Sequence, residues 1–298
     1  MKILVFGSNG QVGSALKSRV ADRFDTAFLT RRDVDLTQAG SVASCVEAYR
    51  PTHIINAAAF TAVDDAEEDF EQAFLINENA VQEMANAAKI VDASVIHYST
   101  DYVFDGTSAR PYVESDATNP LGVYGQSKLA GEYALKKSGC RHVVFRTSWV
   151  ISSVGKNFVK TILRLAKTKD TLNVVSDQVG AVTSADLIAR TTIRYLTQQS
   201  QIKGGDCFHL TASGSGSWFD VATYCVKKAV GAGHALKLDP EHIMPIPAAD
   251  YPTKAQRPGN SRLDTSKLQS VLNETFPTWQ ECVDNTIERL SREGFFSE

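Results

Sequence analysis

The stretch KILVFGSNGQVG at residues 2–13 decides the fold class of this 298-residue chain. Its mostly apolar beginning predicts a buried strand, and the glycines that follow predict a sharp turn into a helix. Glycines at such a turn let the backbone approach a pyrophosphate, which the free N–H groups and the dipole of a helix N-terminus stabilise. We therefore expect a dinucleotide to be bound at Gly7, Asn9, Gly10, Gln11, Val12 and Gly13.

The spacing of these glycines is G-x-x-G-x-x-G, whereas most dehydrogenases carry G-x-G-x-x-G. A glycine turn alone is weak evidence, because such turns also occur for purely structural reasons. Here the turn stands between a strand and an amphipathic helix in which Val12, Leu16 and Val20 recur at helical spacing. This placement favours the dinucleotide site.

Short apolar runs alternate with helical segments through the first half of the chain. Such alternation is typical of βαβ units and a parallel sheet. We therefore predict an α/β fold with a doubly wound parallel sheet, a Rossmann domain, over residues 1–150. The expected strands are residues 2–6, 26–29, 53–58, 94–99 and 142–146, and the expected helices are residues 41–49, 73–91 and 125–137.

Beyond Trp149 the alternation becomes irregular. We expect residues 151–298 to form a smaller, loop-rich substrate-binding lobe, some segments of which return to the Rossmann domain, because no Gly/Ser-rich linker divides the chain. Ser217 and Asp220 predict a helix N-terminus close to a capping box. The expected helices are residues 157–167 and 218–230, and the expected loops are residues 244–252 and 256–262.

Charge and composition exclude several classes of protein. The net charge of −3, from 31 basic and 34 acidic residues, lacks the basic excess of a dedicated nucleic-acid binder. No run approaches the roughly 18 apolar residues that span a bilayer, and the 5 scattered cysteines show no C-x-x-C spacing. These features predict a cytoplasmic protein with reduced thiols, no membrane span and no zinc site.

The segment after the second expected strand reads TRRDVDL, residues 30–36. A ribose 2′-hydroxyl is usually read by an acidic residue at this place, whereas a 2′-phosphate is read by arginine. Arg31 and Arg32 come first and favour NADPH; NADH is the alternative, in which the two arginines are only a solvated surface pair. Asp35 and Leu36 are expected beside the adenine.

Tyr124 and Lys128 form a Y-x-x-x-K pair at an expected helix start. Residues four apart share a helix face, so both side chains can address one reacting centre. A free tyrosine has a pKa near about 10, and a neighbouring ammonium group lowers the pKa of the phenol by favouring the phenolate. Thr100 follows a buried strand at a place where open α/β sheets bind ligands. The hydroxyl of Thr100 or of Ser99 is a candidate donor to a carbonyl, with a strand-terminal cap as the alternative, and His97 in the same strand is interpreted as a core residue.

Together these residues resemble the extended short-chain dehydrogenases/reductases, and among them most closely the dTDP-4-dehydrorhamnose reductase family. The resemblance covers nearly the whole chain, including the expected substrate lobe, which makes it specific. It is carried by the glycine turn at 7–13, STDYVFDG at 99–106, YGQSK at 124–128, NAAAFTAVD at 56–64, RTSWV at 146–150, NF at 157–158, DQ at 177–178, SW at 217–218 and RPGNSRL at 257–263.

The resemblance implies NADPH-dependent reduction of the C4 ketone of a dTDP-linked 4-keto-6-deoxy sugar, dTDP-4-dehydro-6-deoxy-L-mannose, to dTDP-L-rhamnose. It implies that Tyr124 protonates the C4 oxygen, that Lys128 holds the nicotinamide ribose and lowers the tyrosine pKa, and that Thr100 orients the carbonyl. Arg257 also suits a diphosphate on charge grounds, with an ordinary surface arginine as the alternative. The implied cofactor groove includes Ala57, Ala58, Ala59 and Thr61, and the implied sugar-nucleotide site includes Val103, Trp149, Asn157 and Arg257.

Three segments of the chain depart from the family pattern. Ala15 stands where some members carry a glutamate used in a magnesium-linked dimer contact. We therefore expect no metal, and both a monomer and a homodimer stay open. Ile151-Ser152 and Val182 replace a usual Tyr-Gly and an expected proline in the substrate lobe, where they bear on the sugar that is accepted. The acidic cluster at residues 64–69 is interpreted as complementing a helix dipole and not as a metal site.

Three alternatives to this function stay open. A related 4-ketoreductase would give another epimer of the sugar. A sugar-nucleotide epimerase or dehydratase on the same scaffold would keep its NAD bound through turnover. A non-catalytic regulatory subunit is the last alternative, and the intact set of Thr100, Tyr124 and Lys128 argues against it.

Overall fold

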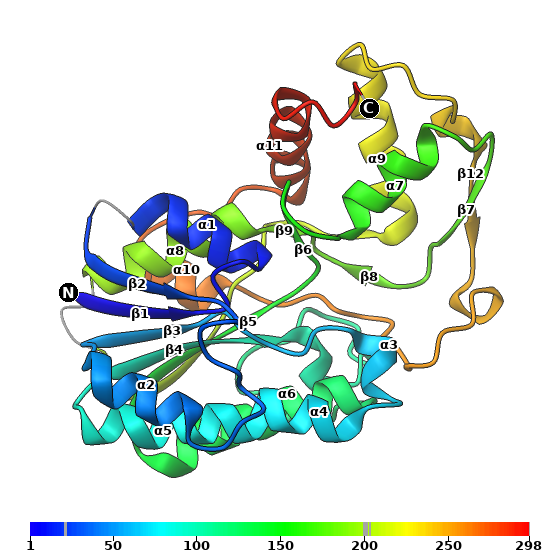
Figure 1. Ribbon diagram of the computed structural model, residues 1–298. Helices are drawn as coiled ribbons and strands as arrows, with labels where there is room; N and C mark the ends of the chain where they lie inside the picture. The colour runs from blue at the N-terminus through cyan, green and yellow to red at the C-terminus, as the bar shows by residue number, and fades with distance from the viewer. Residues whose placement is uncertain (21–22, 199–201, 203, 298) are drawn as a thin grey trace.

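A parallel sheet of six strands forms the centre of the molecule (Figure 1). The computed structural model describes residues 1–20, 23–198, 202 and 204–297. Neighbouring strands of the sheet are parallel, in the order β10-β5-β4-β3-β1-β2. The predicted α/β class with a doubly wound parallel sheet is confirmed. The strands are β1 (Lys2–Phe6), β2 (Asp25–Leu29), β3 (His53–Asn56), β4 (Ser94–Thr100), β5 (Arg141–Thr147) and β10 (Gly205–His209).

Helices cover both faces of this sheet, so its central strands are buried on both sides (Figure 1). Side chains alternate between the two faces along a strand. Ile3 and Val5 of β1 accordingly belong to one apolar cluster, whereas Leu4 and Phe6 belong to another. One face carries α1 (Gln11–Val20), α8 (Ala185–Gln198) and α10 (Ser266–Leu272), and the other carries α2 (Ser41–Tyr49), α5 (Ala80–Ile90) and α6 (Val123–Ser138).

The single helix expected at residues 73–91 is divided in the structure. α4 (Phe70–Phe74) continues into a π-helical segment (Leu75–Asn79) and then into α5. A π turn shifts side chains off the α-helical face, and such turns are frequent at functional sites. The buried Asn77 accepts a hydrogen bond from the Phe60 N–H (2.9 Å) and donates one to the Ser127 hydroxyl (3.0 Å). The π segment therefore ties the loop after β3 to helix α6.

A second lobe lies beyond the carboxyl ends of the strands (Figure 1). The capping box expected at its helix α9 is present, because the Ser217 hydroxyl accepts from the Asp220 N–H (3.1 Å) and the Asp220 carboxylate accepts from the Ser217 N–H (2.8 Å). The prediction of a loop over residues 244–252 is partly wrong, because residues 243–246 form a strand that pairs with β7. The remaining α-helices and strands are α3 (Val63–Ala66), β6 (Val150–Ile151), α7 (Phe158–Ala166), β7 (Leu172–Val175), β8 (Val179–Gly180), β9 (Thr183–Ser184), β11 (Gly216–Ser217), α9 (Trp218–Gly231), β12 (Ile243–Ile246) and α11 (Trp279–Arg292).

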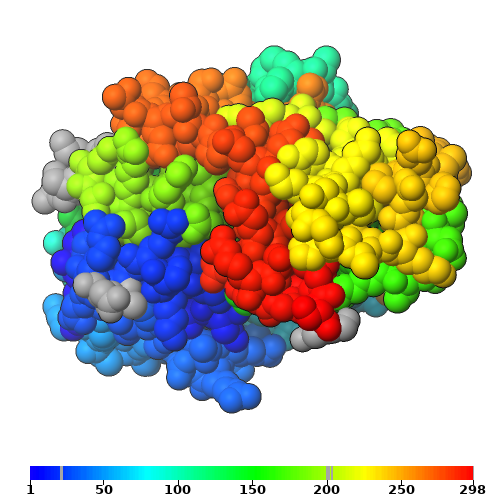
Figure 2. All heavy atoms as spheres, turned by 90° about the horizontal axis from the view of Figure 1, so that it is seen from above, coloured from blue at the N-terminus to red at the C-terminus, as the bar shows by residue number. Residues whose placement is uncertain are grey.

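The two halves of the chain are joined by shared segments. β10 pairs with β5 in the central sheet, and α8 packs beside α1. One apolar cluster extends from Val5 and Leu16 in the sheet region to Val159 and Val226 in the second lobe. Figure 2 shows the C-terminal residues (red) lying between the N-terminal segments (blue) and the yellow segments of the second lobe. The boundary between residues 150 and 151 stays a prediction.

The described helices include none that is both long enough and apolar enough to cross a lipid bilayer. Within the same part of the chain, no three His, Cys, Asp or Glu side chains are grouped so that they could hold a metal ion. All five cysteines carry free thiols.

Candidate active site

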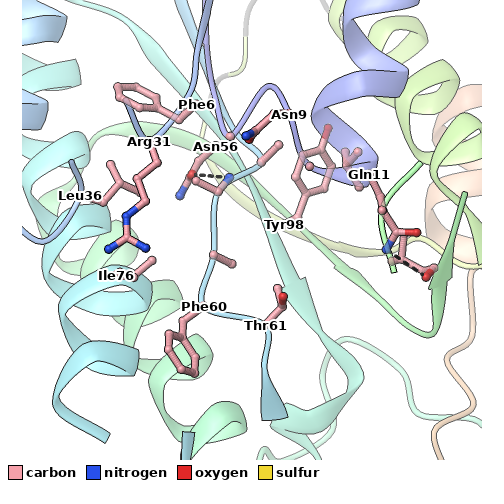
Figure 3. Close-up of a pocket in the computed structure, with 18 of the residues that line it drawn as sticks. Phe6, Asn9, Gln11, Arg31, Leu36, Asn56, Phe60, Thr61, Ile76 and Tyr98 are labelled. Carbon is pink, nitrogen blue, oxygen red and sulfur yellow. Dashed lines mark hydrogen bonds between the residues drawn. The ribbon is translucent and has the colours of Figure 1, made fainter. Parts of the chain in front are cut away.

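A cavity of about 640 Å³ lies at the carboxyl ends of β1 and β3 (Figure 3). β1 is flanked by β2 on one side and β3 on the other, so the order of the strands reverses there. Open α/β sheets bind ligands at such a reversal. The predicted residues that line the cavity are Gly7, Asn9, Gly10, Gln11, Val12, Arg31, Asp35, Leu36, Ala57, Ala58, Ala59, Thr61, Tyr124 and Lys128.

The glycine turn forms one wall of the cavity and leaves no room for side chains. Gly7 has a φ of +75°, and a Cβ atom on it would lie 2.6 Å from the Ala58 backbone nitrogen. Gly13 does not line the cavity; a Cβ atom there would lie 2.7 Å from the Ser8 Cα, so this glycine lets α1 pack against the turn. Gly10, Gln11 and Val12 at the start of α1 line the cavity, and the free N–H groups of a helix N-terminus suit a pyrophosphate.

Two arginines lie at one end of the cavity. Arg31 and Leu36 lie on the side away from Gln11 (Figure 3), and Arg31 and Arg32 also line an adjoining hollow with Asn9 and Thr30. Among the described residues neither arginine forms an ion pair. This end of the cavity is suited to an anionic group of the cofactor.

The acidic residues of the same loop accept hydrogen bonds from neighbouring threonines. The Thr30 N–H (2.8 Å) and hydroxyl (2.7 Å) donate to the Asp33 carboxylate, and these hydrogen bonds lower the Asp33 pKa. Asp35 accepts from the N–H (3.0 Å) and hydroxyl (2.8 Å) of Thr37 in the same way. Arg31 forms no ion pair with either carboxylate among the described residues, although its charge adds to the lowering of the Asp35 pKa, so its guanidinium stays available to a bound anion.

Tyr124 lines the cavity near the N-terminus of α6. Burial raises the pKa of Tyr124 to about 12, while a hydrogen bond with Thr100 acts in the opposite direction. The Thr100 hydroxyl also donates to the Asp101 carboxylate (3.1 Å) and accepts from the Tyr102 N–H (3.2 Å). The raised pKa differs from the lowering expected beside Lys128, because desolvation of the phenol dominates here.

Lys128 lies one turn further along α6 and is only 2 % exposed. Burial lowers the pKa of Lys128 to about 8, and the charge of Glu132 opposes that shift. Its Nζ lies 3.2 Å from Nε2 of His97 on β4. His97 is fully buried, as the sequence predicts, but it contacts a residue of the candidate site directly.

The residues expected around the sugar nucleotide are placed differently from those around the cofactor, since none of them lines the cavity. Trp149, with a φ of +46°, stacks on Trp218 at 3.5 Å between ring centroids and 12° between planes. Arg257 donates to the Asp64 carboxylate at 2.8 Å. Asp64 belongs to the acidic cluster at residues 64–69, so this ion pair connects the cluster to the second lobe.

Asn157 and Val103 are engaged in structural contacts. Asn157 caps α7 by accepting from the Lys160 N–H (3.1 Å), and its Nδ2 donates to the Gln11 side chain (2.9 Å). It therefore links the second lobe to the glycine turn. Val103 is fully buried in a small apolar cluster with Phe104 and others. The roles of Trp149, Asn157, Val103 and Arg257 toward a substrate stay predictions.

Several cavity residues escaped the sequence analysis. Asn56 ends β3, and the hydrogen bond that its side chain accepts from the Ala58 N–H (3.1 Å) is drawn in Figure 3. Ile76 reaches the cavity from the π-helical segment, which the periodicity of the sequence does not distinguish from an α-helix. Gly155 and Lys156 enter from the second lobe, and only the folded chain brings them beside Gln11.

Comparison with known proteins identifies the family of this chain. The family model described as the RmlD substrate binding domain matches residues 1–292. The chain belongs to this family. It is 45% identical to a dTDP-4-dehydrorhamnose reductase of Escherichia coli strain K12, over 97% of this chain and 98% of that relative.

Solved structures give the same result. A crystal structure of a dTDP-4-dehydrorhamnose reductase from Clostridium acetobutylicum has a TM-score of 0.90 and 32% identity, over 98% of this chain and 100% of that one. A second one, from Bacillus anthracis in complex with NADP, has a TM-score of 0.88 and 30% identity, over 97% of this chain and 100% of that one. The fold of the chain, including its second lobe, is therefore shared with dTDP-4-dehydrorhamnose reductases.

Proposed function

We propose that this protein is an NADPH-dependent reductase that converts dTDP-4-dehydro-6-deoxy-L-mannose to dTDP-L-rhamnose, the last step of dTDP-L-rhamnose synthesis. The observation that carries the proposal is that Tyr124 and Lys128 line the same cavity as the glycine turn. A hydride donor and a proton donor then meet at one carbonyl, as ketone reduction requires. The full-length similarity to dTDP-4-dehydrorhamnose reductases supports this choice of substrate.

The residues of the cavity fit NADPH. The turn at Gly7 would hold the pyrophosphate on backbone N–H groups, since the turn packs so closely on Ala58 that only glycine fits at this position. Arg31 would bind the 2′-phosphate, and Lys128 would hold the nicotinamide ribose. Bound NADPH supplies the hydride for the reduction.

Tyr124 is the proton donor in this proposal. Its raised pKa keeps the hydroxyl protonated at neutral pH, so it can donate to the C4 oxygen as negative charge develops there. The hydrogen bond with Thr100 orients the phenol. Lys128, on the same face of α6, stabilises in its charged form the phenolate that remains.

The sugar nucleotide is proposed to bind against the second lobe. The stacked indoles of Trp149 and Trp218 offer a flat apolar surface to a base or a sugar ring. Arg257 suits the diphosphate, because its buried Nε has no hydrogen-bond partner among the described residues. Binding energy from the nucleotide would then position the C4 carbonyl, which accelerates the reaction as well as tightening binding.

The setting of the enzyme is also part of the proposal. We place it in the cytoplasm, as a monomer or a homodimer. The net charge of −3 supports a small-molecule partner and not a nucleic acid. Ala15, at the place of a glutamate in some relatives, supports a reaction that needs no metal ion.

The experiment that tests this function is incubation of the protein with NADPH and the dTDP-linked 4-keto sugar, followed by identification of the product by NMR. The proposal expects NADPH consumption and dTDP-L-rhamnose. A product with the opposite configuration at C4 would mean a related ketoreductase. Protein purified with tightly bound NAD and inert toward NADPH would mean an epimerase or dehydratase, and an inert protein that binds neither substrate would mean a regulatory subunit.

A further inference from the structure

Three buried side chains form a line behind the wall of the cavity: Asn56 on β3, His97 on β4 and Lys128 on α6. They are 1 %, 0 % and 2 % exposed, respectively. Asn56 Nδ2 lies 3.1 Å from His97 Nδ1, and His97 Nε2 lies 3.2 Å from Lys128 Nζ. We propose that His97 is a positioning residue that Asn56 holds in the Nε2–H tautomer, so that it donates a hydrogen bond to Lys128 and favours the neutral amine.

The orientation of the Asn56 amide is fixed by the backbone. Its Oδ1 accepts a hydrogen bond from the Ala58 N–H at 3.1 Å (Figure 3). Turning the amide over would place its NH₂ group against that N–H, so two donors would face each other in a buried place. Asn56 therefore presents Nδ2, which can only donate, to His97.

This orientation determines the tautomer of His97. Because Asn56 donates to it, Nδ1 of the imidazole must carry a lone pair. Burial, together with the nearby Lys128, holds the His97 pKa well below its usual range, so the ring is neutral and carries one proton. That proton is on Nε2, the atom that faces Lys128.

A donor at Nε2 favours an acceptor at Lys128 Nζ and disfavours a charged ammonium group there. An ammonium group has three donors and no acceptor, whereas a neutral amine has a lone pair. Glu132, one turn along α6, does not supply a compensating ion pair, because it is engaged with Arg146 at 2.7 Å. The neutral amine is therefore the form of Lys128 that satisfies this arrangement.

The charged and titratable groups around this line come from two elements, α6 and β5. Tyr124 and Glu132 lie on α6 with Lys128, and Glu132 acts to raise the Lys128 pKa. His142 on β5 lies near enough to His97 to lower its pKa further. Removal of water from Lys128 outweighs the charge of Glu132, so the pKa of Lys128 lies at about 8.

The consequence for catalysis rests on the proposed function. Charged Lys128 favours the phenolate of Tyr124, and this charge is present below the Lys128 pKa and lost above it. By stabilising the neutral amine, His97 sets the pH at which Lys128 loses the charge that supports Tyr124. The same line of hydrogen bonds extends through Asn56 to the N–H of Ala58, which belongs to the proposed cofactor groove.

The first test requires no substitution in the protein that is measured. Long-range ¹H–¹⁵N NMR of histidine-labelled wild-type protein, without ligands, distinguishes the two neutral tautomers, and loss of the signal in His97→Gln assigns it. We expect the Nε2–H tautomer, unchanged between about pH 6 and 8 because the His97 pKa lies well below that range. The Nδ1–H tautomer, or a doubly protonated ring, would overturn the proposal.

The second test follows Lys128 directly with a matched pair of variants. The amide nitrogen of glutamine in His97→Gln can occupy the place of Nε2 and still donate to Lys128, whereas the shorter His97→Asn can reach only Asn56. A titration of ¹³C-labelled lysine side chains should give a Lys128 pKa near 8 in the wild type and in His97→Gln. In His97→Asn we expect it to rise by about one unit, the scale of one lost hydrogen bond. An unchanged or lowered pKa in His97→Asn would contradict the proposal.

The pH profile separates this role from a structural one. If His97 only supported folding, its loss would lower kcat/KM equally at every pH. The proposal instead expects the alkaline limb to move upward in His97→Asn and to stay in place in His97→Gln. Because the NMR tests use no substrate, a wrong tautomer would reject this inference alone, whereas correct NMR results without turnover would reject only the proposed reductase.

Discussion

The two ends of the candidate site differ in how their side chains are used. At the cofactor end, Gly7 and Arg31 line an open cavity, and the loop carboxylates accept hydrogen bonds from neighbouring threonines. At the substrate end, Trp149 stacks on Trp218 and Arg257 pairs with Asp64. The first end is shaped to receive a ligand as it stands, whereas the second holds its proposed binding groups in contacts within the protein. A diphosphate that binds Arg257 therefore has to compete with the Asp64 carboxylate.

The largest expected effect concerns the group between the two ends. Tyr124→Phe should lower kcat by about 10²–10⁴-fold, the scale of general acid catalysis, because only the proton donor is removed. NADPH affinity, measured by fluorescence titration, should stay unchanged. Tyr133→Phe on the same helix is the matched control, since Tyr133 is 56% exposed and should keep wild-type kinetics. Wild-type turnover of Tyr124→Phe would remove the proton donor from this account.

The next effect tests the substrate end. Arg257→Ala should raise KM for the sugar nucleotide by about 10–100-fold, the scale of a lost charge-assisted hydrogen bond. Lys254→Ala is the control, because Lys254 also pairs with the acidic cluster, through Glu68 at 2.6 Å, but lies at an exposed position. Steady-state kinetics should show little change in the control. Equal effects of the two substitutions would mean that Arg257 only attaches the lobe and does not bind the diphosphate.

A smaller effect is expected at the cofactor end. Arg31→Ala should weaken NADPH binding by about 1–3 kcal/mol, because it removes one charge-assisted contact to the 2′-phosphate. NADH lacks that phosphate and provides the comparison within the same protein, so its affinity should change little. Calorimetric titrations with both cofactors measure the difference. A loss of the same size for NADH would show that Arg31 supports the loop and does not read the phosphate.

The smallest expected effect is that of metal removal. Turnover should be the same with a chelator and with added magnesium, because Ala15 takes the place of a carboxylate and the described residues contain no cluster that could hold an ion. Initial rates measured under both conditions test this. Activity that is lost with chelator and returns with magnesium would show that a metal acts at either end of the site.

The same contrast explains how much the sequence could predict. Gly7 to Gly13 and β1 are adjacent in the chain, so local rules of strand, turn and helix were enough to predict their arrangement. Tyr124 and Lys128 are also local, being one helical turn apart. The geometry of these motifs follows from their local sequence, and nearly all the residues that they predict line the cavity.

The remaining features depend on contacts distant in sequence. The π-helical segment keeps an apolar spacing that an α-helix would also have, so no pattern distinguished it. α8 and β10 were not predicted, although they complete the layer beside α1 and the edge of the sheet. The partners of Trp149 and Arg257 come from residues 218 and 64, and no local rule joins such distant positions. His97 was correctly expected to be buried, but its contact with Lys128 depends on how α6 packs on β4.

The most direct test of the central claim follows the hydrogen atom itself. The protein would be incubated with NADPH that carries deuterium at the transferred position and with dTDP-4-dehydro-6-deoxy-L-mannose, and the product would be examined by NMR. The account predicts one deuterium at C4 of dTDP-L-rhamnose, delivered from the cofactor end to a sugar held at the substrate end. A product without deuterium at C4, or no reduction of the ketone, would contradict it.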